Sequence, residues 1–146
     1  MIPRQYRIHV VLMITAALMI IVPLLNEKPD ADKAKLATAA ATEFLSMVDH
    51  DHFESSWKMS AKLMQERVPL EEWREQLVAI RQTLGPLVKR EQSDISYATV
   101  AKDSPEGEYI QIFYDSQFGA KPKVEEILTV MLEPDGQWRV AGYFVQ

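Results

Sequence analysis

The sequence VEEILTVML (residues 124–132) is followed by EPDGQ (133–137) and then by WRVAGYFV (138–145). Both outer runs are rich in β-branched and aromatic residues, which favour strands. Pro134, Asp135 and Gly136 are residue types that form tight turns, so they predict a hairpin between the two strands. The chain is therefore expected to end in an antiparallel sheet.

Two further runs upstream show the same pattern with a period of two. Apolar residues alternate with polar or small ones over residues 95–99, and a second run covers residues 109–114. Turn-forming residues separate the strands at 103–107 and at 119–122. We therefore predict four strands that are joined by hairpins into one antiparallel sheet.

Three helical patterns precede the strands. In the first, apolar residues recur at helical spacing from Ala37 to Val48, and Asp30 or Asp32 can cap its start. The second has an apolar stripe from Phe53 to Val68, and the third runs from Pro69 to Gly85. Helices first and strands afterwards predict an α+β domain with the helices on one face of the sheet.

Residues 31–146 have the length of a single domain that can bury a core without disulfides, and the chain has no cysteine. Trp57, Trp73 and Trp138 lie on the predicted apolar faces and are expected to be largely buried. The whole chain has a net charge of −5 and residues 1–30 carry +1, so residues 31–146 carry −6. Such an acidic domain, which has no basic stripe, is not expected to bind nucleic acid or an anionic membrane surface.

The N-terminal segment predicts a transmembrane helix. Residues 8–25 contain no Asp, Glu, Lys or Arg, and as a helix they would be about 27 Å long, close to the ~30 Å core of a bilayer. Arg4 and Arg7 precede this run and acidic residues follow it, which predicts a cytoplasmic N-terminus. The expected protein is thus a single-pass protein of the inner (cytoplasmic) membrane that contacts the bilayer through residues 8–25 and carries a periplasmic domain.

A cleaved signal peptide is the alternative to this anchor. Cleavage requires small residues shortly after the apolar core, and residues 23–29 contain none. The first Ala-x-Ala, at residues 37–39, lies inside the first predicted helix. The domain plan is therefore a signal-anchor at 1–27, a linker at 28–33 and an α+β domain at 34–146, with secretion to the periplasm after cleavage as the alternative.

An ordered series of Trp, Arg, Gly and Tyr positions runs through residues 37–145. It comprises Phe44–Asp49, Phe53, Ser56, Trp57, Trp73, Arg81, Leu84, Gly85, Arg90, Pro105–Tyr109, Phe118, Lys121, Glu126, Gly136, Trp138–Val140, Gly142 and Tyr143. This series resembles a bacterial exported family known as domain of unknown function 4019. The chain departs from the family pattern at Asp103 and Ser104, which replace a glycine-containing turn, and in its acidic, His-bearing first turn.

The resemblance implies an architecture and no established activity. The order of helices followed by a curved sheet is also similar to the cone-shaped fold of nuclear transport factor 2-like domains, which suggests a pocket but no particular reaction. The expected fold class is α+β, with three N-terminal helices packed on a four-stranded antiparallel curved sheet and preceded by one transmembrane helix.

Four residues are candidates for ligand binding: Arg81, Arg90, Tyr109 and Glu126. Arg81 flanks the apolar stripe of the third predicted helix, Arg90 stands at the start of the first strand, and Glu126 in the third strand is a candidate partner. A guanidinium buried near aromatic side chains needs a carboxylate or carbonyl partner. Two interpretations stay open, since the arginines could tie a helix to the sheet or face a pocket that holds an anionic group of a ligand.

The run Asp49-His50-Asp51-His52 supplies ligand types that suit zinc or copper. The only other histidine, His9, lies in the N-terminal apolar segment, and there is no cysteine. The sequence therefore predicts a solvated turn between two helices, with no metal and no cofactor.

The leading functional hypothesis is a non-catalytic binding module of the cell envelope that binds a protein partner or a small ligand. The alternative is a small pocket-bearing enzyme or ligand-binding protein of the nuclear transport factor 2-like type. As an enzyme it would use a carboxylate or tyrosine such as Asp115 or Tyr109 as acid or base. An enzyme requires a cavity with a converging carboxylate or tyrosine of perturbed pKa, whereas an interaction module requires an exposed apolar patch.

Overall fold

The structure, a computed structural model, describes residues 27–146 of the 146-residue chain. The helices come first, and they are α2 (Ala31–Asp49), α3 (Phe53–Lys58), α4 (Lys62–Arg67) and α5 (Leu70–Leu84). The strands follow as β1 (Leu87–Ala98), β2 (Tyr109–Phe118), β3 (Lys121–Leu132) and β4 (Trp138–Val145). This part of the chain is an α+β domain with four antiparallel strands.

One part of the predicted fold class, the transmembrane helix, has to be corrected. Within residues 27–146, no helix combines the length and the apolar character needed to cross a membrane. Residues 8–25, for which that helix was predicted, lie outside the described residues. The predicted single-pass anchor and inner-membrane localisation therefore have no support in the structure.

The second predicted helix, over residues 53–68, is in fact two short helices, α3 and α4. Between them, Ser60 Oγ donates a 2.5 Å hydrogen bond to the Trp57 carbonyl, which competes with helical hydrogen bonding. The Ala61 N–H donates to the Val140 carbonyl of β4 at 2.7 Å. A backbone donor that bonds a strand cannot continue a helix, so residues 27–146 contain four helices where three were predicted.

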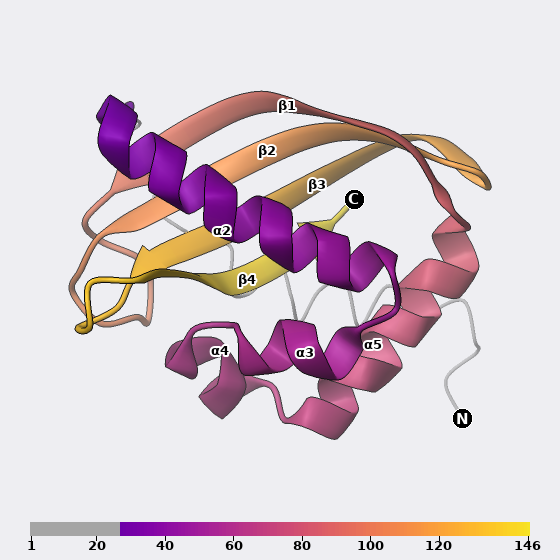
Figure 1. Ribbon diagram of the computed structural model, residues 1–146, viewed down its shortest axis with the longest axis horizontal. Helices are drawn as coiled ribbons and strands as arrows, with labels where there is room; N and C mark the ends of the chain where they lie inside the picture. The colour runs from indigo at the N-terminus through magenta and orange to yellow at the C-terminus, as the bar shows by residue number, and fades with distance from the viewer. Residues whose placement is uncertain (1–26) are drawn as a thin grey trace.

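Helix α2 lies across one face of the curved sheet, and α3, α4 and α5 lie beside it (Figure 1). Asp30 caps α2 by accepting a 2.9 Å hydrogen bond from Lys33 N, as the sequence predicts. α2 contacts β2, β3 and β4, and α4 also contacts β4. The buried side of α2 therefore packs on the sheet, through Ala37, Ala41, Phe44, Leu45 and Val48.

The sheet has the strand order β1-β2-β3-β4, with each neighbouring pair antiparallel. Gly136, in the predicted turn between β3 and β4, has φ 83°, a conformation that glycine adopts without strain. Arg90 of β1 is opposite Ser116 of β2, and Tyr114 of β2 is opposite Glu126 of β3. Because side chains alternate along a strand, this register places all four on the face that the helices cover.

The three tryptophans differ in burial. Trp73 is 2% exposed and Trp138 is 8% exposed, as predicted. Trp57 is only half-buried at the edge of the core, where its indole N–H donates to the Val68 carbonyl at 2.8 Å. Trp57, which lies on the short helix α3, is therefore the least buried of the three tryptophans.

Candidate functional site

Glu126 is the most buried charged group among the described residues, with 0% exposure. Arg90 donates to both of its carboxylate oxygens, from Nε at 2.8 Å and from Nη2 at 3.1 Å. Ser116 Oγ and the Tyr143 hydroxyl donate to it as well, each at 2.5 Å. The contact between Arg90 and Glu126 that the sequence suggested is thus confirmed, and Ser116 and Tyr143 complete it.

Arg90 also joins the sheet to the end of α2. Its Nη1 and Nη2 atoms donate to the two carboxylate oxygens of Asp49 at 2.7 and 3.0 Å. Paired hydrogen bonds of this kind are the strong form of an arginine–carboxylate contact. Asp49, Arg90, Glu126, Ser116 and Tyr143 therefore form one continuous group, which we call the buried charge network.

Contacts within the network determine the protonation states of Arg90 and Tyr143. Burial alone would lower the pKa of the Arg90 guanidinium, but hydrogen bonds and charges from Asp49 and Glu126 outweigh burial and raise that pKa. Burial, together with the negative charge of Glu126, raises the pKa of the Tyr143 hydroxyl well above its ordinary value of 10.0. Arg90 therefore remains a cation and Tyr143 a protonated donor at neutral pH.

Arg81 of α5 meets the other side of the same turn. Its Nη2 donates to the Asp49 carbonyl at 2.9 Å, which satisfies a backbone acceptor at the end of α2. Its Nη1 lies 3.8 Å from Asp49 Oδ1, and its Nε lies 3.5 Å from Asp51 Oδ1. Arg81 thus ties α5 to the end of α2, whereas Arg90 ties α2 to the sheet.

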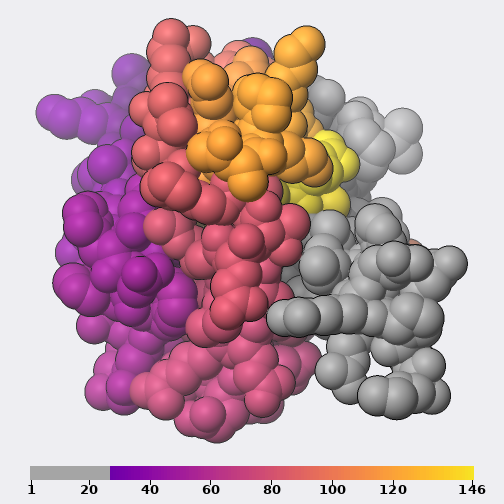
Figure 2. Space-filling view, turned by 90° about the vertical axis from the view of Figure 1, so that its right-hand side faces the viewer, coloured from indigo at the N-terminus to yellow at the C-terminus, as the bar shows by residue number. Residues whose placement is uncertain are grey.

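Arg81 also lines a surface hollow of about 470 Å³. Its lining residues come from the turn after α2, from the start of α3, from α5 and from the turn that leads to β1, and they are Asp51, Phe53, Val78, Arg81, Gln82, Gly85 and Pro86. Figure 2 shows this end of the molecule, with the end of α5 and the start of β1 in the middle and the purple α2–α3 region beside them. We call this site the Arg81 hollow.

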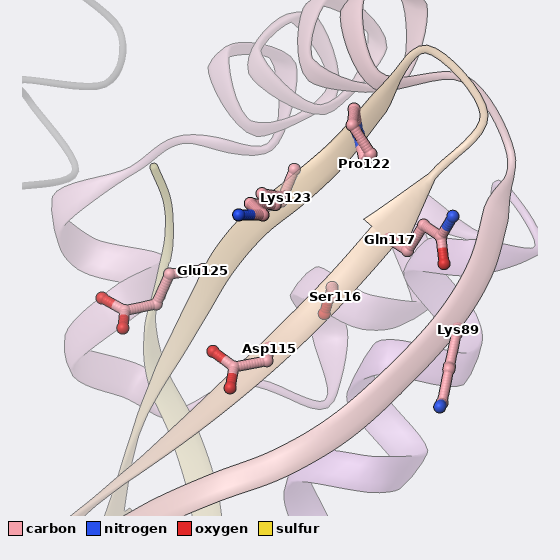
Figure 3. A pocket seen from close by; sticks show the side chains of 8 residues that line it. Lys89, Asp115, Ser116, Gln117, Pro122, Lys123 and Glu125 are labelled. Atoms are coloured by element: carbon pink, nitrogen blue, oxygen red, sulfur yellow. The ribbon is translucent and has the colours of Figure 1, made fainter.

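A second hollow, of about 520 Å³, lies over the start of β1, the end of β2 and the start of β3. Figure 3 shows side chains from these strands around it, with Asp115 on β2, the strand between β1, which carries Lys89, and β3, which carries Lys123. These charged side chains are exposed, and the one buried lining hydroxyl, on Ser116, already donates to Glu126. Although it is the larger of the two hollows, its cations on Lys89 and Lys123 are exposed, whereas Arg81 is a half-buried cation, so we favour the Arg81 hollow.

Tyr109 and Asp115 lie away from the buried charge network. The Tyr109 hydroxyl donates to the Pro105 carbonyl at 2.6 Å, and its ring packs in a separate small cluster with Ala61, Ala101, Met131 and Ala141. Asp115 is exposed and lines the second hollow. The structure therefore brings together Arg81, Arg90 and Glu126 of the four predicted site residues, with Asp49 between the two arginines, and leaves Tyr109 elsewhere.

The Asp49–His52 turn contributes an ion-pair partner. His50 Nδ1 lies 2.7 Å from the Ser46 carbonyl, and the rings of His50 and His52 are 6.4 Å apart. No group of three or more potential metal-ligating side chains gathers within the part of the chain that the structure describes. The carboxylate of Asp49 is instead bonded to Arg90.

A family model described as "Protein of unknown function (DUF4019)" matches residues 40–143. This match covers more than half of the chain and includes the whole buried charge network. The chain belongs to this family. The resemblance found in the sequence is thus confirmed, and both the network and the Arg81 hollow lie inside the DUF4019 region.

Solved structures share the fold of this DUF4019 domain at low sequence identity. Aln2 from a Streptomyces species aligns with a TM-score of 0.52 at 9% identity, over 82% of this chain and 93% of Aln2. A protein from Catenulispora acidiphila aligns with a TM-score of 0.50 at 12% identity, over 80% of this chain and 91% of that one. No curated protein matches the chain in sequence. The likeness to nuclear transport factor 2-like domains stays a prediction.

Two buried tyrosines of the DUF4019 domain allow a matched test of the network. Tyr143→Phe removes a hydrogen bond to the buried Glu126 carboxylate, so it is expected to lower the free energy of unfolding by about 1.5–3 kcal/mol. The Tyr114 hydroxyl is buried and has no partner within residues 27–146, so Tyr114→Phe should change stability by less than about 0.5 kcal/mol or raise it. Urea unfolding at pH 7, followed by tryptophan fluorescence, measures both, and equal losses would contradict the assigned contacts.

Tyr114 also gives the free energy of unfolding a predictable dependence on pH. Burial raises the pKa of Tyr114 from 10.0 to about 12, so the folded protein holds this proton more tightly than the unfolded chain. The resulting stability is present below about pH 10 and is lost as pH rises toward 12. Tyr114→Phe should therefore lose less stability than the unaltered chain between pH 10 and 12, whereas identical pH profiles would count against the raised pKa.

Proposed function

We propose that this domain is a non-catalytic binding module whose binding surface is the Arg81 hollow. The observation that carries the proposal is the saturation of Glu126. This carboxylate accepts four hydrogen bonds, two from Arg90 and one each from Ser116 and Tyr143. A carboxylate has about four acceptor positions, so Glu126 has none left for the proton of a substrate.

The residues of the alternative, a pocket enzyme, do not converge. Asp115 is exposed beside the second hollow, and the Tyr109 hydroxyl is bonded to a backbone carbonyl in a separate cluster. An acid–base enzyme needs such groups to meet around one substrate atom. No specific observation therefore favours the enzyme over the binding module.

The Arg81 hollow has the composition of a binding surface. Its volume of about 470 Å³ is within the range of small-ligand sites, which combine apolar walls with a few polar groups. Val78 at its wall is 42% exposed, one of four large exposed apolar side chains among the described residues. Phe53 and Pro86 add apolar surface, and Arg81 supplies a half-buried cation.

The absence of cysteine from the chain allows a direct test. An environment-sensitive fluorophore attached through Gln82→Cys reports on the Arg81 hollow, and the same fluorophore attached through Gln117→Cys reports on the second hollow. Both glutamines are exposed, so neither change should disturb the fold. N-acetylated amino acids and their amides serve as the probes.

At least one apolar probe is expected to change the fluorescence at position 82 with saturation, while the label at position 117 stays silent. Unchanged thermal unfolding of both labelled proteins is the control for folding. Silence at position 82 with every probe, or equal responses at the two positions, would show that the Arg81 hollow is not the binding surface.

A further inference from the structure

The guanidinium of Arg81 makes few hydrogen bonds for a side chain that is only 18% exposed. Arginine has five N–H donors, and among the described residues only its Nη2 makes a hydrogen bond, to the Asp49 carbonyl. The contacts of Nη1 with Asp49 and of Nε with Asp51 are 3.8 and 3.5 Å long. These are ion-pair distances beyond those of good hydrogen bonds. Arg81 can therefore bind a carboxylate more closely than it binds the present ones.

Asp51 marks where such a carboxylate would sit. Its side chain is 70% exposed, yet it is placed beside Arg81 Nε and lines the hollow. Its backbone has φ 60°, a left-handed conformation that aspartate and asparagine tolerate better than most residues. The turn thus holds the Asp51 carboxylate next to the guanidinium without a good hydrogen bond between them. A ligand carboxylate can replace it.

The walls around Arg81 define the rest of the ligand. Phe53 at the start of α3, Val78 on α5 and Pro86 in the turn before β1 offer apolar surface. Asp51 and Gln82 are exposed polar residues of the lining. The half-buried side chain of Arg81, which is 18% exposed, is screened less by solvent than a surface arginine, so a carboxylate gains more by pairing with it.

We propose that the Arg81 hollow binds a carboxylate that carries a neighbouring apolar group, and that this carboxylate displaces Asp51 from Arg81. This chemistry is shared by small apolar carboxylic acids and by peptide C-termini that end in an apolar residue. The inference rests on the proposed function, because it names the ligand class of the same hollow. Asp51 then acts as a built-in competitor that weakens binding without blocking it.

The test uses the full-length chain labelled with ¹⁵N and two matched probes, N-acetyl-phenylalanine and its amide. Affinities come from the Arg81 Nε–H signal and from backbone signals of the hollow. The acid is expected to bind about tenfold more tightly than the amide or better, because only the acid forms charge-assisted hydrogen bonds. A five-residue peptide ending in phenylalanine, with a free or amidated C-terminus, distinguishes chain ends from free acids as the preferred source.

Three variants test the roles of single residues. Asp51→Asn keeps a residue that tolerates the left-handed backbone and removes the competing charge, so it should tighten acid binding by about threefold or more and leave amide binding unchanged. Gln82→Glu adds a negative charge to the lining without touching Asp49 and should weaken binding of the acid alone. Arg81→Gln should abolish the preference for the acid, but it also removes the contact of Arg81 with the end of α2. Gln82→Glu tests the charge preference while leaving that contact in place.

The outcomes separate this inference from the proposed function. Equal affinities for acid and amide at the hollow would overturn the carboxylate assignment and leave the binding surface intact. Tight acid binding that ignores Asp51→Asn would overturn the role of Asp51. If no probe shifts the signals of the hollow, the proposed function is wrong, and the inference fails with it.

Discussion

Replacing Arg90 with methionine is expected to lower the free energy of unfolding by about 3–5 kcal/mol. The change leaves the Glu126 carboxylate, which is 0% exposed, without its cation and without two of its four hydrogen bonds. It also removes the paired bonds to Asp49 at the end of α2. Urea unfolding followed by tryptophan fluorescence measures the loss.

Arg139→Met is the matched control for this change. Arg139 also pairs with two carboxylates, on Glu133 and Asp135, but its side chain is 33% exposed. Its removal should cost no more than about 1 kcal/mol. The double variant Arg90→Met with Glu126→Leu should recover part of the loss, because no buried charge is then left unpaired. Equal losses of stability for Arg90→Met and Arg139→Met would show that burial does not determine how much an ion pair contributes to stability.

Trp73→Ala is expected to cost about 3–5 kcal/mol, as for other large aromatic side chains in cores. The Trp73 ring lies 5.9 Å from the ring of Phe44, which joins α5 to α2, and its indole N–H donates to Ser56 Oγ at 3.0 Å. Removal would leave a cavity and a buried serine hydroxyl with one partner fewer. Calorimetry or urea unfolding measures the effect.

Trp57→Ala provides the comparison, because this tryptophan is only half-buried. Its loss should be clearly smaller than that of Trp73, although it too removes a hydrogen bond, to the Val68 carbonyl. A cost for Trp57→Ala that equals or exceeds that for Trp73→Ala would mean that the core is centred on α3 and not on α5.

Local sequence signals were sufficient for the order and type of most elements. The cap at Asp30 and the turn at Gly136 depend on residues within a few positions. Asp30 was one of two predicted candidates for the cap, and the turn at Gly136 was predicted correctly. The break between α3 and α4 was missed, because the Ala61 N–H bonds to the Val140 carbonyl far along the chain. The transmembrane prediction rested on the hydropathy of residues 8–25, on the charges that flank them and on the missing cleavage site, whereas no helix of residues 27–146 is long and apolar enough to cross a membrane.

The candidate site could be predicted only in part, because several of its contacts join residues that are far apart in the chain. A buried arginine requires a carboxylate or carbonyl partner, which made Glu126 a candidate partner of Arg90. Ser116 and Tyr143 join through the strand register, which places Ser116 opposite Arg90 and Tyr143 opposite Leu128. The register shift between Thr129 and Val130 is not visible in the sequence. The Arg81 hollow depends on how the α2–α3 turn meets α5, which no local pattern determines.

The buried charge network also bears on the time course of folding. Arg90 bonds to residues 41 positions before it and 36 positions after it in the chain. Closing such long loops costs chain entropy, and this cost arises before the new contacts can stabilise the chain. We therefore expect these bonds to form after the rate-limiting step, so that weakening them mainly speeds unfolding and shortens the lifetime of the native state.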